Sequence, residues 1–384
     1  MQHLAQVDLG RRFFSQLDER STALAPGLYR NPVSDYTCEK QAALEARVFF
    51  REHPLVLGLS GDLPNPGDYL TNDLTGTPIL VVRGEDGGVA AFLNVCRHRG
   101  AKVAQGCGAG KKVFTCPYHG WSYDRQGELV GLPEEKLFGK LDRAEYALRR
   151  LPVAEKHGLI WVRPTPGDGF EPDALLGELA PELAAYDFGR YLHWETRTLR
   201  HKLNWKLVVD TFLEGYHIAV LHKATIADIF TKTNSFDAYG RNLRMGIARR
   251  AIEGLRGRPE AEWDVLKQTA LVYILYPNTV LVWQLDHVES FRVYPAGNGM
   301  DEAAMDVSLY IPEAAESEKA KTHWRKNMDL LIRTVEGEDF PVGEGMQRGF
   351  RSGAQDAITF GRNEPALHHY HRQIRAGLGL PAVG

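Results

Sequence analysis

The sequence is poor in cysteine, carries little net charge and lacks long apolar runs. Four cysteines in 384 residues are too few for a disulfide framework, so we expect a reducing, cytoplasmic setting. A formal net charge of −3 gives no field that would attract nucleic acid or an anionic membrane. The best candidate for a membrane span, 270–283, is short and is interrupted by Pro277 and Asn278. The first residues also lack the apolar core of a secretory signal.

The chain is long enough for two hydrophobic cores, because 384 residues exceed the usual limit of about 250–300 for one core. Periodic apolar residues at 8–24 and 40–50 predict helices. From there on, short β-prone runs alternate with Gly, Pro, Asp and Asn, and GEDGG at 84–88 predicts a hairpin turn. These runs predict an all-β domain over residues 45–165.

The rest of the chain combines strands with charged helices, which predicts an α+β fold class. Five β-prone runs follow one another and indicate a single antiparallel sheet, and two charged helical stretches close the chain. The runs cover 243–251, 269–276, 279–285, 288–294 and 304–311, and the helices cover 313–336 and 363–377. A strand is also predicted near 192–201, before these runs.

The stretch NWKLVVDTFLEGYHIAVLH at 204–222 places acidic and imidazole groups at helical spacing. Asp210, Glu214 and His217 lie at i, i+4 and i+7, which is one face of a helix. His222 follows five residues after His217, an offset that predicts a distortion or a helix end between them. A metal site and a hydrogen-bonded structural pair both fit this pattern, and the stretch alone leaves the two open.

Two Cys–His pairs in the β-domain give a more specific signal. One loop carries Cys96 and His98, and a second carries Cys116 and His119. Zinc sites usually pair Cys with Cys and His with His, whereas here each loop offers one of each. This arrangement suits a [2Fe–2S] cluster in which two Cys hold one iron and two His hold the other. The other two cysteines are expected to be inert.

The motifs CRHRG at 96–100 and CPYHGW at 116–121, with NWK and EGYH-x4-H downstream, resemble the α subunits of Rieske non-haem iron ring-hydroxylating oxygenases. The resemblance covers nearly the whole chain. It implies an all-β Rieske [2Fe–2S] domain at 45–165. This domain would be inserted in a helix-grip (START-like) catalytic domain with an antiparallel sheet, made of the N-terminal helices at 1–44 and residues 166–384.

The resemblance also implies a mononuclear Fe(II) site. His217 and His222 match its two imidazole ligands, and the third ligand is a carboxylate far downstream. EDF at 338–340, followed by EGMQRG at 344–349, matches that pattern, so Asp339 is the predicted ligand. Asp356 is the alternative. A triad of two His and one carboxylate leaves open positions for O2.

Glu214 departs from the family's usual pattern. In ring-hydroxylating members, the residue three before the first ligand His is usually an Asp that links a Rieske His of one subunit to an iron ligand of its neighbour. The resemblance implies this bridging role for Glu214, whose longer carboxylate is similar to that of quaternary-amine members such as carnitine monooxygenases. Asp210 is open to a catalytic role or to that of a hydrogen-bonded core carboxylate.

The implied function is that of a terminal oxygenase, which uses O2 and electrons to hydroxylate or cis-dihydroxylate an aromatic or related small organic substrate. One alternative is a monooxygenase or demethylase that acts on a quaternary amine. The alternative of another class is an electron-carrying iron–sulfur protein, which does not need His217, His222 and Asp339 together.

The implied partners are a reductase, with or without a ferredoxin, and further copies of the chain in a homotrimer. No GxGxxG motif follows a strand, and GAGKK at 108–112 fails the phosphate-loop spacing. NAD(P)H is therefore expected to act only indirectly, through the reductase. A head-to-tail trimer is the simplest closed ring for electron transfer between subunits.

The substrate pocket is sketched from residues after the second iron-ligand His and along the later strands. Aromatic walls there would suit an aromatic substrate or, by cation–π attraction, a quaternary ammonium group. The candidates are Ile226, Ile229, Phe230, Phe236, Tyr239, Trp283, Leu285, His287 and Phe291. The late histidines His368, His369 and His371 are expected to face solvent.

Overall fold

The computed structural model describes residues 1–383 and divides into two compact units. The larger unit comprises Met1–Glu45, Leu176–Tyr186 and the chain from Tyr191 onward, and the smaller unit comprises Ala46–Leu175 and Asp187–Arg190. The chain thus leaves the larger unit, builds the smaller one and returns. Within residues 1–383, no helix is long and apolar enough to cross a membrane.

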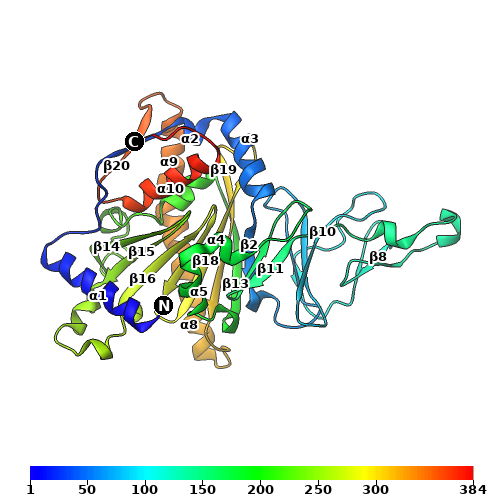
Figure 1. The fold of residues 1–384 in the computed structure, drawn as a ribbon, viewed down its shortest axis with the longest axis horizontal. Coiled ribbons are helices and arrows are strands. Elements are labelled where there is room, and N and C mark those ends of the chain that lie inside the picture. The colour runs from blue at the N-terminus through cyan, green and yellow to red at the C-terminus, as the bar shows by residue number, and fades with distance from the viewer. Residues whose placement is uncertain (384) are drawn as a thin grey trace. The chain divides into compact units, whose positions relative to one another are not determined.

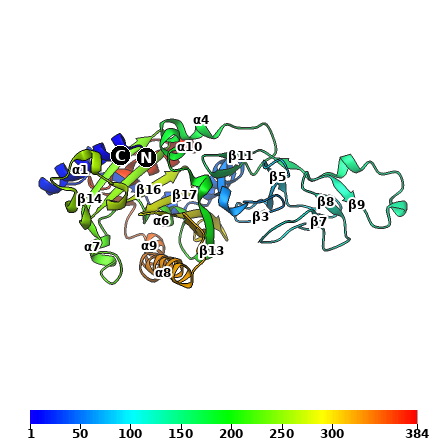
Figure 2. The ribbon, with the colours of Figure 1, turned by 90° about the horizontal axis from the view of Figure 1, so that it is seen from below.

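The smaller unit contains three antiparallel sheets, with strand orders β10-β5-β4-β3-β6, β11-β12-β2 and β7-β8-β9. In Figure 2, β7, β8 and β9 lie together beyond β3 and β5. The predicted hairpin at 84–88 is confirmed, because it joins the paired strands β4 and β5. The strands are β2 (Leu55–Leu59), β3 (Tyr69–Asn72), β4 (Ile79–Arg83), β5 (Val89–Leu93), β6 (Cys107–Gly108), β7 (Val113–Thr115), β8 (Ser122–Asp124), β9 (Leu129–Gly131), β10 (Arg150–Leu151), β11 (Val153–Lys156) and β12 (Leu159–Val162).

The larger unit is built on one seven-stranded antiparallel sheet, in the order β13-β19-β18-β17-β16-β15-β14 (Figure 1). The prediction of a single antiparallel sheet is confirmed, and β14 is the strand that it missed. A register shift interrupts the pairing of β14 with β15, which blurs the alternation that marks a strand. The strands are β13 (Leu192–His201), β14 (Phe230–Tyr239), β15 (Asn242–Arg249), β16 (Thr269–Leu275), β17 (Thr279–Gln284), β18 (His287–Ala296) and β19 (Glu302–Ile311).

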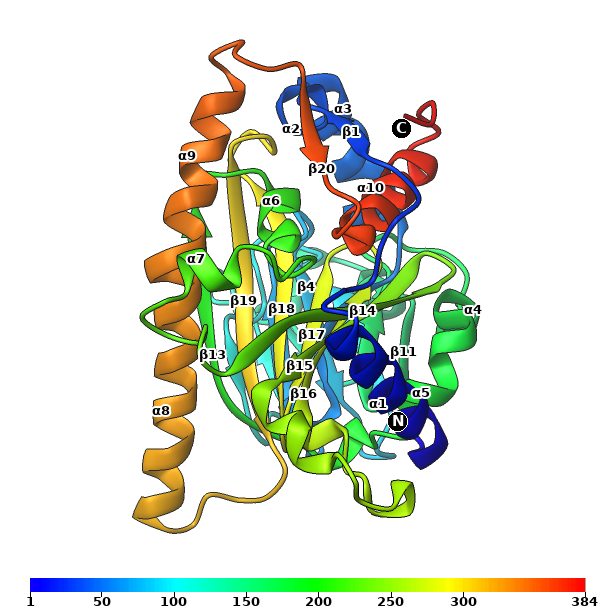
Figure 3. The same cartoon turned by 90° about the vertical axis from the view of Figure 1, so that its left-hand side faces the viewer.

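Helices pack around this sheet. A π-helical turn at Val335–Asp339 joins α8 to α9, so the two run on as one long helix beside the sheet (Figure 3). The chain's early strand β1 (Tyr29–Pro32) pairs with the late strand β20 (Ala357–Phe360). The helices are α1 (His3–Asp18), α2 (Ser34–Thr37), α3 (Glu39–Arg47), α4 (Pro172–Leu176), α5 (Ala180–Ala184), α6 (Trp205–Asp210), α7 (Ile218–Leu221), α8 (Glu318–Thr334), α9 (Phe340–Phe350) and α10 (Pro365–Gly377).

Helix α10 corrects the expectation for the late histidines. His371 is completely buried and His368 is 3% exposed, while His369 is partly buried, so the three do not face solvent. The reason is that α10 turns one face to the interior, where the ring of Tyr36 lies 5.6 Å from that of His371. Histidine tolerates such positions because its ring can both pack and hydrogen-bond.

The fold class is confirmed: an all-β domain is inserted in a domain of helices and one antiparallel sheet.

Candidate metal centres and the cavity beside one of them

Two loops of the smaller unit fold in the same way around Cys96 and Cys116. In each loop the cysteine N–H donates to the carbonyl of the residue five positions on, over 2.8 Å. The glycine four positions on donates back to the cysteine carbonyl, from Gly100 over 2.9 Å and from Gly120 over 3.0 Å. Both glycines have positive φ, which glycine adopts without steric cost. The repeated turns present a matched pair of Cys–His loops.

The donor atoms in these loops fit a [2Fe–2S] cluster. Cys96 and Cys116 are each 3% exposed, and burial raises the pKa of the Cys96 thiol. His98 Nδ1 is buried without a hydrogen-bond partner, and its ring lies 4.6 Å from that of His119. A buried polar nitrogen without a partner costs free energy, which binding a metal would recover. Two sulfurs and two imidazoles are the donor set of a Rieske centre.

Neighbouring rings hold these donors in place. Trp121 stacks on His98 with a centroid distance of 4.9 Å and an interplanar angle of 8°. The Tyr123 hydroxyl lies 3.4 Å from Cys96 Sγ and accepts the N–H of Arg97 over 3.0 Å. Hydrogen bonds to ligand sulfurs are one of the ways in which proteins set a cluster's potential. Tyr123 was not singled out from the sequence, where nothing marks a tyrosine 27 residues from Cys96 as its neighbour.

In the larger unit, the stretch 204–222 does not form the single helical face that its spacing predicts. Asn204 caps α6 by accepting the N–H of Lys206 over 3.0 Å, but α6 ends at Asp210. Glu214 and His217 lie in the turns that follow, so the prediction of one face with Asp210 was wrong. A close approach explains the glycine at position 215, because a Cβ there would lie 2.8 Å from the Asn234 side chain.

The predicted helix end near the two histidines is confirmed. His217 immediately precedes the one-turn helix α7, and His222 immediately follows it. The short helix therefore lets both imidazoles turn towards each other although they are five residues apart.

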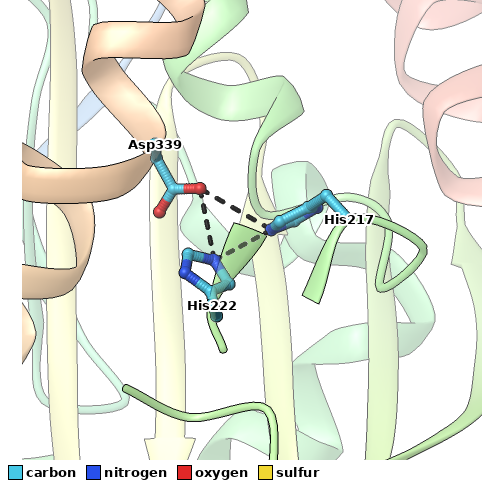
Figure 4. A group of neighbouring side chains, drawn as sticks. All are labelled: His217, His222 and Asp339. Atoms are coloured by element: carbon cyan, nitrogen blue, oxygen red, sulfur yellow. Dashed lines mark hydrogen bonds and ion pairs between the residues drawn. The ribbon is translucent and has the colours of Figure 1, made fainter. Parts of the chain in front are cut away.

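His217, His222 and Asp339 form one group, with their ligand atoms all within 4.8 Å of one another (Figure 4). The two Nε2 atoms are 3.1 Å apart, and Asp339 Oδ1 lies 3.6 Å from His217 Nε2 and 3.3 Å from His222 Nε2. Asp339 and His222 are buried. The alternative ligand Asp356 is exposed and lies outside this group. Two imidazoles and one carboxylate on one side of a site suit Fe(II) with open positions.

A carboxylate stands behind each imidazole. Glu214 accepts from His217 Nδ1 and, over 3.1 Å, from the His217 backbone N–H. Glu338 accepts from His222 Nδ1 and from the Thr225 hydroxyl, each over 2.6 Å. A hydrogen on each Nδ1 leaves the Nε2 lone pairs free to face a metal. Burial opposes the charge on His222, but Asp339 and Glu338 raise its pKa.

Glu338 is a site residue that the sequence did not identify. Its bond to His222 spans 116 residues, and its only sequence signal is its position next to Asp339. The π-helical turn at Val335–Asp339 explains how two consecutive residues reach one imidazole, Glu338 at Nδ1 and Asp339 at Nε2. Such wide turns recur at functional sites.

Asp210 makes its side-chain hydrogen bonds away from this group. It accepts from the Tyr36 hydroxyl over 2.7 Å and pairs with His371 Nε2 over 2.8 Å. Both partners are completely or almost completely buried. These contacts join α6 to α2 and α10, as a hydrogen-bonded core carboxylate would.

A cavity of about 290 Å³ opens beside the histidine and aspartate group. Of the predicted lining residues, those that line it are Ile226, Ile229, Phe230, Leu285 and His287. The others, Phe236, Tyr239, Trp283 and Phe291, are not among its lining residues. Trp283 points to the other face of the sheet, where its ring lies 4.5 Å from that of Tyr186. Phe236, Tyr239 and Phe291 lie instead against His369, Arg244 and Phe212.

Apart from His287, the charged and polar groups in the cavity wall were not predicted. Alternate residues at the ends of the strands supply them: Arg249, Gln284, His287 and Glu289. Burial opposes the charge on His287, but Asp286 at 3.2 Å and Glu289 at 3.7 Å raise its pKa to about 9. The wall therefore carries charges of both signs.

Comparison with known proteins gives the same two-part division. Residues 53–144 match the model of the Rieske [2Fe-2S] domain, and residues 188–379 match that of the ring hydroxylating alpha subunit (catalytic domain).

Curated relatives include both amine and aromatic oxygenases. The carnitine monooxygenase oxygenase subunit of Escherichia coli strain K12 is 32% identical over 367 residues, covering 89% of this chain and 92% of the relative. Choline monooxygenase of Spinacia oleracea is 28% identical over 85% of this chain and 72% of its own length. The chlorobenzene dioxygenase subunit alpha of a Cupriavidus species is 34% identical, over 54% of this chain and 46% of its own.

Solved structures share the fold. A quaternary ammonium Rieske monooxygenase in complex with L-carnitine gives a TM-score of 0.76 at 18% identity, covering 92% of this chain and 96% of the other. Naphthalene 1,2-dioxygenase from Rhodococcus, bound to indole, gives 0.71 at 17% identity, with 97% of each chain covered.

Proposed function

Because the chain belongs to the α subunits of the Rieske non-haem iron oxygenases, we propose that it is an oxygenase that oxidises a small quaternary amine. The family makes it the terminal oxygenase component, an oxidoreductase with a Rieske [2Fe–2S] domain and a non-haem iron domain. A protein that only carries electrons would not need the second domain.

We assign the cluster to Cys96, His98, Cys116 and His119, and the iron to His217, His222 and Asp339. When bound, the cluster supplies single electrons and the ferrous iron activates O2. Glu214 and Glu338 hold the two iron-ligand imidazoles in the orientation and tautomer that the metal needs.

Glu214 is also the proposed bridge to the cluster of a neighbouring copy in a homotrimer. The residues around it support a contact between copies, because Tyr216 is 75% exposed and Val220 is 73% exposed. Exposed apolar side chains that cluster beside a functional residue commonly mark an interface. A reductase, with or without a ferredoxin, would supply the electrons.

The charged wall of the small cavity is the observation that carries the substrate class. Ligand pockets span about 300–1,000 Å³, so a cavity of about 290 Å³ suits a small molecule. Glu289, which is 8% exposed and lies 3.7 Å from His287 Nε2, would share its carboxylate between that imidazole and a cationic substrate, and Phe212 and Phe230 offer ring faces. An unsubstituted hydrocarbon would leave the wall charges desolvated without compensation. Two curated relatives that match over most of their length are named for choline and carnitine.

The proposed reaction inserts one oxygen atom into a C–H bond next to the nitrogen. The substrate, O2, two electrons and two protons give the hydroxylated amine and water. The hydroxylated ammonium then loses its hydroxyl proton to water and breaks its C–N bond; the nitrogen leaves with the bonding electrons as a smaller, tertiary amine, and the carbon leaves as an aldehyde.

Hydroxylation or cis-dihydroxylation of an aromatic substrate is the second candidate. The partial match to the chlorobenzene dioxygenase subunit favours it, as do the two phenylalanine rings in the cavity wall.

A substrate screen separates the two candidates. Quaternary amines, aromatic acids, arenes and aryl ethers are incubated with the protein, a surrogate reductase and O2, and oxygen-dependent products are measured. We expect products from quaternary amines, with an aldehyde released in a one-to-one ratio to the smaller amine. Products from arenes alone would overturn the amine proposal.

Counting iron and acid-labile sulfide tests the iron assignment. His222→Ala is expected to lose about one iron per chain while keeping the sulfide and the cluster's visible spectrum, because the two sites use different ligands. His323→Ala, at an exposed position of α8, is the matched control. An unchanged iron count in His222→Ala would refute the assignment.

A further inference from the structure

One guanidinium in the cavity wall lacks a carboxylate partner. Arg249, at the end of β15, donates one hydrogen bond to Gln284 Oε1 over 2.5 Å and lies 5.1 Å from the centre of the Phe230 ring. Among the described residues, no carboxylate lies within 4.0 Å of it, and its Nε has no hydrogen-bond partner. Burial lowers the pKa of Arg249, which shows that the site disfavours its charge as it stands.

Arg244, on the same strand, is a guanidinium that carboxylates of the protein hold, although its Nε also lacks a hydrogen-bond partner. It donates to both oxygens of Glu182, over 2.8 and 2.6 Å, and to Asp237 over 2.7 Å. Arg375 is likewise paired, with Asp35 at 2.5 Å. Arg244 and Arg375 are held by carboxylates of the protein, whereas Arg249 lines a cavity large enough for a ligand.

The wall around Arg249 has unused hydrogen-bond donors that could bind an anionic group. A guanidinium carries five N–H donors in a fork that matches a carboxylate, and Arg249 uses one of them on a side chain. Gln284 accepts that bond with its oxygen and lines the cavity too, so its amide nitrogen remains a donor. Glu289, which acts on Arg249 only through longer-range attraction, supplies the opposite charge elsewhere in the wall.

We propose that the substrate carries a carboxylate and that Arg249, held by Gln284, binds it. The inference rests on the proposed amine oxidation and narrows its substrate to a zwitterion with a quaternary ammonium group and a carboxylate. Arg249 then fixes one end of the molecule at the sheet wall. The carbon to be oxidised lies towards His217, His222 and Asp339, and Glu289 compensates the ammonium charge.

Equilibrium binding of matched ligands to the holoenzyme tests the carboxylate directly. γ-Butyrobetaine and its carboxamide have the same shape and the same ammonium group, and differ in the anionic end. The wild type is expected to bind the carboxylate at least tenfold more tightly than the amide, because the hydrogen bonds are charge-assisted. Equal dissociation constants for the two ligands would overturn the proposal.

Arg249→Met is expected to weaken carboxylate binding roughly 10- to 100-fold and amide binding less than about threefold. Arg250→Met, at the exposed neighbouring position, is the matched control and should change neither. Arg249→Lys keeps the positive charge but not the planar guanidinium, and it replaces the Met variant if that variant does not fold. It should weaken carboxylate binding by less than Arg249→Met does. An equal loss for both ligands in both variants would show that Arg249 only supports the wall.

Turnover of choline and γ-butyrobetaine shows whether a failure lies in the carboxylate site or in the proposed amine oxidation. If choline and γ-butyrobetaine are oxidised with equal efficiency in the wild type and in Arg249→Met, amine oxidation stands and the carboxylate site fails. If 3-phenylpropanoate binds more tightly than its amide in an Arg249-dependent way while neither amine is oxidised, the carboxylate site stands and amine oxidation fails.

Discussion

At the scale of single residues, the proposed sites depend on side chains that are not themselves assigned as ligands. Glu214 and Glu338 each bind the Nδ1 of a histidine, and through it they decide which nitrogen of that ring faces Asp339. The same division holds in the smaller unit, where Tyr123 and Trp121 hold Cys96 and His98. These neighbours are therefore where single substitutions should tune the site without abolishing it.

Replacing Glu338 with Ala is expected to weaken iron binding about 10- to 100-fold, because His222 loses the partner that fixes its ring and tautomer. Glu338→Gln keeps an acceptor oxygen and should lose less. The measurement is the iron dissociation constant, and Glu336→Gln, at an exposed position of the same helical turn, is the control. Equal affinity in Glu338→Ala and the wild type would contradict the role.

His287 predicts a pH dependence of stability. Its pKa is raised from 6.5 to about 9 in the folded protein, so its contribution is fully present below pH 6.5 and is lost as the pH rises towards 9. The loss amounts to about 3 kcal/mol. Urea unfolding between pH 6 and 9.5 should show a decline in the wild type that is smaller in His287→Gln, whereas His323→Gln should follow the wild type.

At the scale of elements, the π-helical turn between α8 and α9 is the feature that builds the site. A π-helical turn holds one more residue than an α-helical turn, which shifts the residues after it around the helix axis. The extra residue of the wide turn lets both reach His222. The helices α8 and α9 also stay in line, because the extra residue is accommodated within the π-helical turn (Figure 3).

Deleting Gly337 should therefore convert the wide turn into an ordinary helix and remove the iron, while the Rieske cluster's spectrum and sulfide content stay unchanged. Gly337→Ala is the matched control, because no atom lies within 4 Å of the added Cβ. Full iron content after the deletion would show that Asp339 reaches the site without the wide turn.

The sequence predicts the motifs better than the geometry around them. The Cys–His loops are short, local and chemically distinctive, and so are His217 and His222. By contrast, Glu338 meets His222 across 116 residues, and no periodicity records that contact. The prediction of the cavity wall was partly wrong for another reason. Aromatic residues such as Trp283 were expected to line the cavity, but the alternation of side chains along the strand turns Trp283 to the opposite face of the sheet.

At the scale of the whole molecule, the inserted unit separates two parts of the chain that must meet in the larger one. Lys206 on α6 and Glu45 on α3 form an ion pair over 2.7 Å, and both are almost completely buried. Trp205 Nε1 also donates to Glu45, over 2.8 Å. These contacts tie the first segment of the larger unit to its last.

Lys206→Met should destabilise the protein by roughly 3–5 kcal/mol, since it leaves the Glu45 carboxylate buried without its cation. Adding Glu45→Gln should recover much of this loss, because the amide oxygen still accepts from Trp205 without carrying a charge. Urea unfolding measures both, with Lys202→Met at an exposed position as control. A double variant no more stable than Lys206→Met would show that the charge is not the cause.

The cavity's construction bears on how such an enzyme changes over generations. The side that carries the residues assigned to iron comes from the α7 turns and the long helix, whereas the opposite wall comes from strand residues that alternate along the sheet. Four apolar wall positions, Ile247, Ala270, Val272 and Val282, can be randomised together in a library without altering any residue assigned to iron. Selection, natural or in the laboratory, can thus diversify the accepted molecule while the oxidising machinery is inherited intact.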